Sequence, residues 1–168
     1  MQRAATMIAS ATAALALGAG TPVTGARAQP TRERIAAGRP IGVLIIPRLG
    51  EQLVVRQGVA ASVLQYGPGH YPQTSLPGQA GTIAIAGHRV THTRPFLHLN
   101  LLRRGDPITL VARDRRFRYR VYAMKIVSPA SLWVLMRHSR TPRLVLTTCH
   151  PPRLATYRLV VFARQMGR

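Results

Sequence analysis

The sequence predicts an all-β domain that is either a closed barrel or a sandwich. From Ile41 onward the apolar residues come in short runs separated by Pro, Gly and Asp turns, which is typical of strands rather than of long helices. Seven or eight such runs are enough to close a barrel or to build two sheets. The chain has 168 residues, the length of a single domain. Its 46% hydrophobic content excludes a chain that is disordered throughout.

The predicted strands share a short apolar run bounded by turn residues, and they cover 41–46, 52–56, 82–86, 108–112, 117–127, 144–148 and 158–163. In 82–86 both alternating faces are apolar, so we expect that strand to be buried on both sides, in the middle of the sheet. Two other runs, 58–65 and 95–104, are predicted to be short helices or irregular segments. Pro68 and Gly105 follow them as stop signals.

The N-terminal 28 residues have the three-part layout of a secretory signal. Arg3 precedes an uncharged apolar stretch, and Ala26-Arg27-Ala28 offers the small residues that signal peptidase needs. The stretch is short and rich in alanine, so 1–28 is predicted to be a cleaved signal peptide, with a weak membrane anchor as the alternative. Residues 29–40 are polar and basic, as in a linker, which leaves 41–168 as the folded domain.

The charge of the chain is strongly one-sided. It carries 24 Lys or Arg against four Asp or Glu, a net charge of +20, which favours contact with polyanions but identifies none. The run 113–120 alternates arginine with aromatic residues, which could serve nucleic-acid stacking. A hairpin explains it more simply, with Asp114 and Arg115 in the turn, Phe117 and Tyr119 facing inward and arginines facing solvent. We therefore predict no specific nucleic-acid partner.

Cys149 is the one cysteine of the chain. It excludes an intramolecular disulfide and a Cys-rich zinc site. His92, His98 and His150 could be imagined joining His88 and Cys149 around a metal, but no pair of them has the compact spacing of known zinc motifs. No metal and no cofactor are predicted. A lone cysteine is most often a small buried apolar residue, so its neighbours decide its role.

Those neighbours point to a reactive thiol. Between Cys149 and Arg158 lie eight residues that include Pro151 and Pro152, enough to reverse the chain into an antiparallel hairpin. Cys149 then leaves one strand where Arg158 enters the next. A guanidinium near a thiol favours the thiolate and can hold a developing oxyanion.

A base or acid for the thiol stands at the end of another strand. The run G-T-I-A-I-A-G-H ends its strand at His88, as the later strand ends at Cys149. If these two strands are parallel neighbours, the imidazole reaches the same rim. Gly87 would let the backbone bend, or let a substrate approach closely.

Several motifs in this order resemble the sortases, a family of bacterial surface transpeptidases. They are I-P-R-L-G at 46–50, A-G-H-R-V-T-H at 86–92, P-F at 95–96, L-R-R-G-D at 102–106, L-T-T-C at 146–149, C-H-P at 149–151 and Arg158, nine residues after the cysteine. The pattern is most similar to class E sortases of high-GC bacteria and runs from about Ile41 to the C-terminus. Val145 departs from the family's T-L-x-T-C motif, which starts with threonine.

The resemblance implies a closed eight-stranded sortase-type barrel with one or two short helices. It further implies that Cys149 attacks the Thr-Gly carbonyl of an LPxTG-like or LAxTG-like sorting signal and forms a thioacyl enzyme. An amine then accepts the protein, for example a peptidoglycan precursor or a pilin lysine. His88 would shuttle the proton and Arg158 would orient the signal and stabilise the oxyanion.

Four other residues are expected around this centre by similarity or by position. They are Thr148 at the oxyanion hole, Thr147 beside it, His150 at the mouth of the groove, and Trp133, which is either core or a wall of the groove. The protein is expected outside the cytoplasm, secreted or attached to the outer face of the cytoplasmic membrane. Two alternatives remain open: a secreted basic protein that binds wall polymers or nucleic acid, and a thiol hydrolase without transferase activity.

Overall fold

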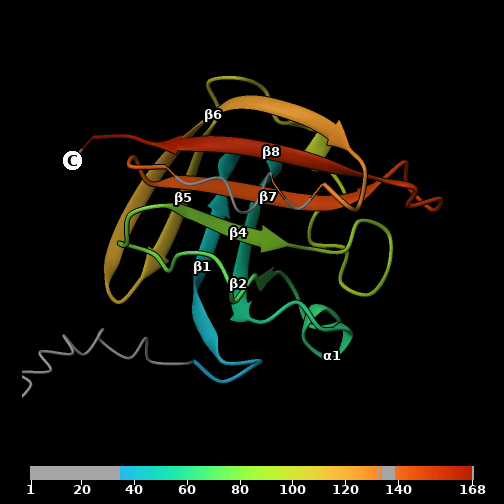
Figure 1. Cartoon of the computed structure of the whole chain (residues 1–168), viewed down its shortest axis with the longest axis horizontal. Coiled ribbons are helices and arrows are strands. Elements are labelled where there is room, and N and C mark those ends of the chain that lie inside the picture. The colour runs from blue at the N-terminus through green and yellow to red at the C-terminus, as the bar shows by residue number, and fades with distance from the viewer. Residues whose placement is uncertain (1–34, 132, 134–138, 168) are drawn as a thin grey trace, which may run out of the picture. The chain divides into compact units, whose positions relative to one another are not determined.

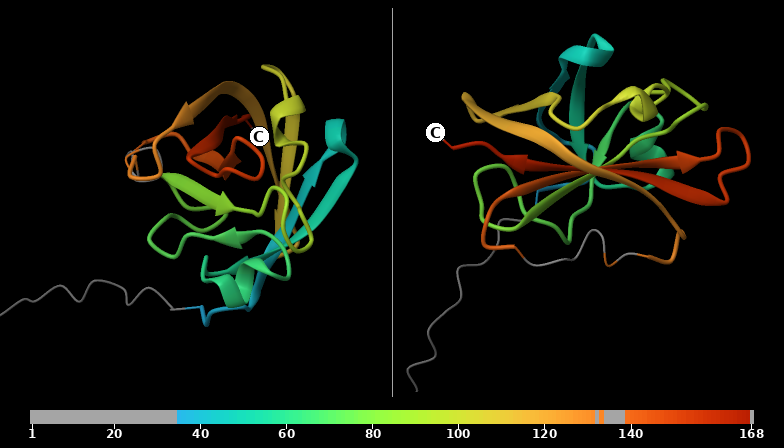
Figure 2. Two further views of the ribbon diagram at one scale, coloured as in Figure 1. Left: turned by 90° about the vertical axis from the view of Figure 1, so that its right-hand side faces the viewer. Right: turned by 90° about the horizontal axis from the view of Figure 1, so that it is seen from above.

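The barrel closes through eight strands. The computed structural model describes residues 35–131, 133 and 139–167, and within them the strands follow the order β1-β2-β3-β4-β7-β8-β6-β5, with β5 paired to β1 (Figure 1). Figure 2 shows how the strands wrap around a common interior. The all-β fold class and the closed eight-stranded barrel predicted from the sequence are confirmed.

The strand bounds are β1 (Pro40–Ile46), β2 (Glu51–Gln57), β3 (Gly69–His70), β4 (Thr82–Ala86), β5 (Pro107–Ala112), β6 (Arg115–Val127), β7 (Arg143–His150) and β8 (Tyr157–Gln165). All seven strands predicted from the sequence are present, each within two residues at either end. The eighth, β3, has only two residues and lies in a segment rich in Pro and Gly, so no apolar run signals it.

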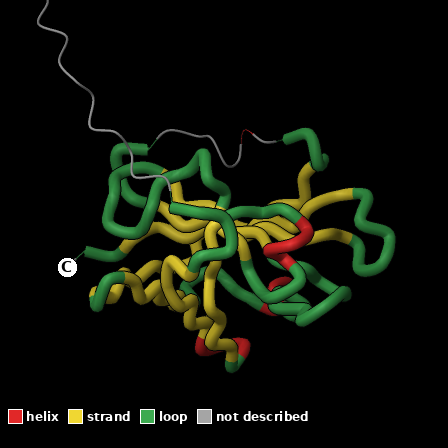
Figure 3. The backbone as a smooth tube through the Cα atoms, turned by 90° about the horizontal axis from the view of Figure 1, so that it is seen from below, coloured by secondary structure: helices red, strands yellow, loops and turns green. Residues whose placement is uncertain are grey.

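Helical structure is short in the described residues (Figure 3). It consists of one turn of α-helix, α1 (Ala61–Leu64), and two 3₁₀ turns, η1 (Pro47–Leu49) and η2 (Leu99–Leu101). The runs 58–65 and 95–104 therefore form much less helix than their lengths allow. In the second run Phe96 and Leu99 are fully buried in the barrel core, so packing rather than helical periodicity decides the path of the chain.

The β5–β6 hairpin turns one residue earlier than predicted. Arg113 and Asp114 occupy the turn with φ of 49° and 58°, and Ala112 pairs with Arg115. The assignment of Asp114 and Arg115 to the turn was therefore wrong, because a two-residue hairpin turn with positive φ at both positions matches the twist of the flanking strands. Phe117 lies inward, as predicted, and so does Tyr119.

The chain joins the barrel slightly before the predicted boundary at residue 41. Gly38 and Arg39 exchange backbone hydrogen bonds with Gln57, and β1 begins at Pro40. The predicted signal peptide or anchor, 1–28, lies outside the described residues, as does 29–34 of the predicted linker. In the part of the chain that is described, no helix has the length and apolar character needed to cross a membrane.

Two apolar layers lie on either side of β4 and β7. Alternate residues of the strands face the barrel interior, which Ile83, Ile85 and Leu146 help to fill. The residues between them face outward, and a second buried cluster forms there from Ala84, Val145, Val160 and Phe162. All five residues of β4 are buried, as expected for a strand covered on both faces.

Candidate active site

The parallel pairing of β4 with β7 brings the two predicted catalytic strands together. Ala86 of β4 is the register partner of Thr147 of β7, so His88 and Cys149 leave the same edge of the sheet two residues later. Figure 1 shows β7 between β4 and β8, with the loops that follow β4 and β7 at the same side of the barrel. The parallel arrangement that the sequence left as a condition is present.

The chain around His88 is tied to the chain around Cys149 on both sides of β4's end. The Gly87 N–H donates to the Thr147 carbonyl at 3.1 Å, and the Thr148 hydroxyl donates to the Gly87 carbonyl at 2.8 Å. Gly87, the residue before His88, is thereby fixed to the segment that carries Cys149, and Thr148, the residue before Cys149, is fixed to the segment that carries His88. Such bonds hold the two backbones in a defined register at the point where the strands end.

Gly87 is required by close packing. A Cβ placed on it would lie 2.6 Å from Cδ2 of Phe96, whose ring is fully buried. The Phe96 N–H also donates to the His88 carbonyl at 3.1 Å. The glycine therefore lets the ring of Phe96 cover the backbone directly before His88.

The β7–β8 hairpin places Arg158 beside Cys149. The two residues are direct cross-strand partners, and the side chains of such a pair project from the same face of the sheet. Cys149 is a free, half-buried thiol rather than a sealed core residue. By alternation along β7 it shares the outer face with Val145 and Thr147, so the thiol stands at the end of the outer apolar cluster.

The guanidinium of Arg158 is held by the hairpin loop. Its Nη1 donates to the carbonyls of Ala155 at 2.8 Å and Tyr157 at 2.9 Å. Ala155 adopts the left-handed conformation, with φ of 57°, which turns the loop back toward β8. The cation is thus positioned at the rim by backbone carbonyls that fold around it.

His88 is half-buried, and its ring stacks on that of His92 with centroids 4.7 Å apart. Within the described residues its Nε2 is buried and has no hydrogen-bond partner. The pKa of His88 is lowered from its ordinary value, first because burial disfavours the imidazolium and second because a charge on His92 repels it. The ring is therefore biased to the neutral form, with one nitrogen uncommitted.

The other four predicted site residues occupy different positions. Thr147 is buried and shares a 3.3 Å hydrogen bond with the Tyr71 hydroxyl on the outer face. Thr148 faces the other side of β7, and its buried hydroxyl donates a hydrogen bond to the Gly87 carbonyl. His150 is half-buried at the rim. Trp133 is 50% exposed, and its flanks at 132 and 134–138 lie outside the described residues.

Two residues at this site were not singled out from the sequence. Tyr71 follows β3 and packs on the outer apolar cluster next to Thr147. Arg89 follows His88 and is buried, with its guanidinium bonded to the Cys149 carbonyl and to the His150 ring at the end of β7. Neither could be found by periodicity, since both lie in irregular segments, although the A-G-H-R motif did place Arg89 directly beside the proposed catalytic histidine.

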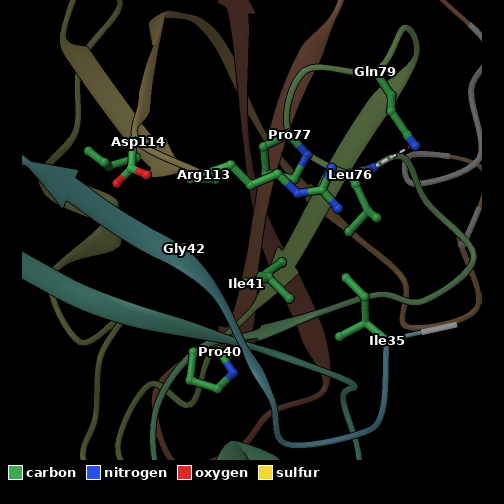
Figure 4. Close-up of a pocket in the computed structure, with 11 residues that line it drawn as sticks. Ile35, Pro40, Ile41, Gly42, Leu76, Pro77, Gln79, Arg113 and Asp114 are labelled. Atoms are coloured by element: carbon green, nitrogen blue, oxygen red, sulfur yellow. Dashed lines mark hydrogen bonds between the residues drawn. The ribbon is translucent and has the colours of Figure 1, made fainter. Parts of the chain in front are cut away.

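A separate pocket lies away from this rim. It has a volume of about 420 Å³ and lies between the start of β1, the β5–β6 turn and the loop that leads into β4 (Figure 4). Leu76 and Gln79 in that loop are joined by a 3.0 Å hydrogen bond. The loop precedes β4 whereas His88 follows it, so the length of the strand separates the pocket from the thiol.

In residues 35–131, 133 and 139–167 no group of three His, Cys, Asp or Glu is placed to hold a metal ion. The rim carries the Cys149 thiol, imidazoles and guanidinium groups.

Comparisons with known proteins agree with the arrangement. The sortase domain model matches residues 44–166. Sortase SrtE1 of Streptomyces coelicolor is 31% identical over 147 residues, covering 77% of this chain and 41% of the relative. Sortase D of Bacillus subtilis is 32% identical over 114 residues, covering 68% of this chain and 56% of the relative. The chain thus spans about half the length of these curated relatives.

The solved structure of sortase E from Streptomyces avermitilis has the same fold. It is 34% identical, with a TM-score of 0.71, and the match covers 79% of this chain and 91% of that one. A barrel of this topology, a family match over most of the chain and a thiol paired with arginine at a strand end all agree with the motifs found in the sequence. The chain belongs to the sortase family.

Proposed function

We propose that this protein is a cysteine transpeptidase that cleaves an LPxTG-like or LAxTG-like sorting signal after threonine and transfers the upstream protein to an amine. One observation carries the proposal. The β4–β7 and β7–β8 registers bring His88, Cys149 and Arg158 to one edge of the sheet. Family membership supports the same reaction, because sortases are cysteine transpeptidases.

In the first half of the reaction the Cys149 thiolate attacks the carbonyl carbon of the Thr-Gly bond. The carbonyl oxygen becomes an oxyanion, which Arg158 stabilises with its guanidinium. The carbon–nitrogen bond then breaks, and the His88 imidazolium gives its proton to the departing glycine nitrogen. A thioester remains on Cys149 and His88 is neutral.

The second half reverses the proton transfer. An incoming amine attacks the thioester while neutral His88 takes the proton that the amine loses. A new amide forms, the carbon–sulfur bond breaks, and Cys149 leaves as the thiolate. The lowered pKa of His88 suits this step, because the ring must act as a base at neutral pH.

The outer apolar cluster is buried, so it would support the path of the signal from below, and half-buried Tyr71 at its border would meet the apolar part of the signal. Val145, Val160 and Phe162 are on the same face as Cys149, and Tyr71 borders them next to Thr147. Thr147 is buried and would act on the signal through the Tyr71 ring that it holds, and His150 and Trp133 would border the path of the signal. Thr148 would support the oxyanion site from the backbone side, since its hydroxyl is bonded to Gly87.

The partners and the location follow from the same proposal. The substrates would be secreted proteins that carry the sorting signal, and the acceptor a peptidoglycan precursor or a pilin lysine. Such substrates place the enzyme outside the cytoplasm, secreted through the 1–28 segment or attached by it to the membrane. Binding of wall polymers or nucleic acid by the +20 charge alone is the non-enzymatic alternative.

The test is a ligation assay with a fluorescent LAxTG-containing peptide, an LPxTG-containing peptide and an amine acceptor. Transpeptidation predicts a product that joins the Thr-terminated fragment to the amine, and its loss in Cys149→Ala. A product cut after Thr but never joined to the amine would make the protein a hydrolase. If neither peptide is cut and a methanethiosulfonate labels Cys149 no faster in the native protein than in the unfolded one, the enzymatic proposal fails.

A further inference from the structure

A second guanidinium lies at the proposed active site, below the surface. Arg89 is 4% exposed and reaches across the end of β7. Its Nη1 donates to the Cys149 carbonyl at 3.3 Å and to the Nδ1 of His150 at 2.9 Å, and its Nη2 donates to the Asn100 side-chain oxygen at 2.8 Å. One side chain therefore joins the loop after β4, the η2 turn and the end of β7.

The charge of Arg89 has no carboxylate partner in the described part of the chain. The described carboxylates are Glu51, Asp106 and Asp114, and Asp106 pairs with Arg48. The three groups that accept hydrogen bonds from Arg89 are neutral, and its Nε is buried without a partner among described residues. Burying a cation without a counter-ion is costly, so an anion at this place would be stabilised.

The anion that the proposed chemistry creates there is the Cys149 thiolate. The pKa of Arg89 is lowered, chiefly because burial disfavours its charge, and the charge of Cys149 opposes that effect. Arg158, in contrast, is exposed enough to meet a substrate, and its Nη1 is bonded to the loop carbonyls. The two arginines are therefore placed for different tasks.

The hydrogen bond to His150 also fixes the orientation of that ring. A guanidinium nitrogen donates, so Nδ1 of His150 is turned toward Arg89. The carbonyl of Cys149 is fixed by the same nitrogen, which restrains the backbone that carries the thiol.

We propose that Arg89 is a positioning residue of the active site, which clamps the backbone of Cys149, orients the ring of His150 and supplies the buried positive charge that balances the thiolate. This inference rests on the proposed function and assigns a separate role within it. Arg158 acts on the substrate side of the thiol, and Arg89 acts from the buried side, on the backbone at the end of β7.

Other ionisable groups at this rim act on the thiol as well and must be considered in any pH measurement. The loop after β4 contributes His88, His92 and Arg94. The β7–β8 hairpin contributes His150, Arg153, Tyr157 and Arg158. None of them makes the hydrogen bond that Arg89 makes to the Cys149 carbonyl among the described residues. Among the described residues, a variant at position 89 therefore changes the one cation that is bonded to the Cys149 carbonyl.

The test measures the rate at which iodoacetamide alkylates Cys149 as a function of pH, in the native chain and in Arg89→Gln. We expect the variant to react about tenfold more slowly near pH 7, with its rate–pH profile moved to higher pH, because an adjacent buried cation favours a thiolate by about one to three pH units. Arg89→Lys should restore most of the alkylation rate because it keeps the charge.

The matched control is Arg118→Gln, which removes the same charge from an exposed position on β6. Arg118 lies nine residues from Val127, the residue opposite Arg158, or about 30 Å along an extended strand. This variant should leave the alkylation profile unchanged. An equal shift in Arg118→Gln would overturn the proposal by showing that net charge, rather than the buried guanidinium, controls the thiol.

Turnover of the sorting peptide separates clamping from charge. Arg89→Lys should retain KM and lose at least about fivefold in kcat, because one ammonium cannot span three acceptors. A kcat of Arg89→Lys equal to that of the native protein would contradict the role of Arg89 as a clamp on the Cys149 backbone. If circular dichroism shows that Arg89→Gln is unfolded, Asn100, the exposed acceptor of Arg89, is changed instead. Asn100→Ala should slow alkylation about threefold, in the same direction as Arg89→Gln.

An alkylation profile that is the same in native protein, in folded Arg89→Gln and in Asn100→Ala would refute the inference. Failure of the proposed function gives a different result, because alkylation needs no substrate. If no sorting peptide is cut but the alkylation profile still shifts, the transpeptidase assignment fails while the thiol–guanidinium relationship stands.

Discussion

The hydroxyl of Thr148 donates a 2.8 Å hydrogen bond to the carbonyl of Gly87, which joins the residue before Cys149 to the residue before His88. The bond is buried and crosses between parallel strands whose sequence positions are 61 residues apart. Together with the pairing of β4 with β7, it fixes the backbone next to Cys149, the proposed nucleophile, relative to the backbone next to His88, the proposed acid.

Thr148→Val should destabilise the protein by about 1–2 kcal/mol, because it leaves the buried carbonyl of Gly87 without its donor. Urea unfolding followed by circular dichroism measures the change. The peptide-cleavage rate should fall as well, since His88 and Cys149 lose a tether. Thr148→Ser keeps the hydroxyl and should lie much closer to the native protein. A valine variant as stable and active as native would show that the bond contributes nothing.

Gly87→Ala should cost about 1–3 kcal/mol in unfolding free energy, because its Cβ would meet the buried ring of Phe96 at 2.6 Å. Denaturant titration gives the value. The double variant Gly87→Ala with Phe96→Leu should be less destabilised than the sum of the two single variants, because the smaller side chain makes room. Simple additivity of the two changes would contradict a direct steric conflict.

His92→Ala should raise the pKa of His88, because the variant removes both a like charge and a ring that covers His88. The imidazolium of His88 would then persist to higher pH. Titration of the His88 ring by NMR measures the shift, with His98→Ala as a control at an exposed histidine. A pKa of His88 that falls in His92→Ala would reverse the sign and contradict the electrostatic account.

Arg158→Ala should move the pH optimum of peptide cleavage upward, because removing a cation beside the thiol makes the thiolate harder to form. The measurement is kcat/KM from about pH 6 to about pH 10, a range that spans the ordinary pKa values of an imidazole and a thiol. Arg118→Ala, at an exposed position on β6 far from the thiol, is the control and should keep the native optimum. An unchanged optimum in Arg158→Ala would remove Arg158 from thiolate activation.

Tyr119→Phe should stabilise the barrel by about 1 kcal/mol. The Tyr119 side chain is fully buried, and its hydroxyl has no hydrogen-bond partner in the described residues. Burial also raises the pKa of this phenol well above its usual range, so the hydroxyl is protonated at any working pH. Tyr66→Phe, at an exposed tyrosine, should change the unfolding free energy by less than about 0.5 kcal/mol. A destabilised Tyr119→Phe would reveal a partner for the hydroxyl.

Strands with a strong apolar signal were predictable, and those without one were not. The run that becomes β4 is apolar on both faces, which already indicates a strand in the middle of a sheet. β3 consists of Gly69 and His70 and is held by pairing to β2 and β4, so only its neighbours define it. The turn at Arg113 and Asp114 was misplaced by one residue because several charged residues there are equally suited to a turn.

The chain by itself determined which chemistry was available and where along the chain it lay. A single thiol, an arginine nine residues later and a histidine after an apolar strand follow from residue order, because a short proline-rich loop can only return the chain beside itself. The tertiary structure alone decided that His88 leaves the same edge of the sheet as Cys149, and that Arg89 turns inward to the cysteine backbone. Parallel strands distant in sequence carry no local signal of their register, because packing of both faces sets it.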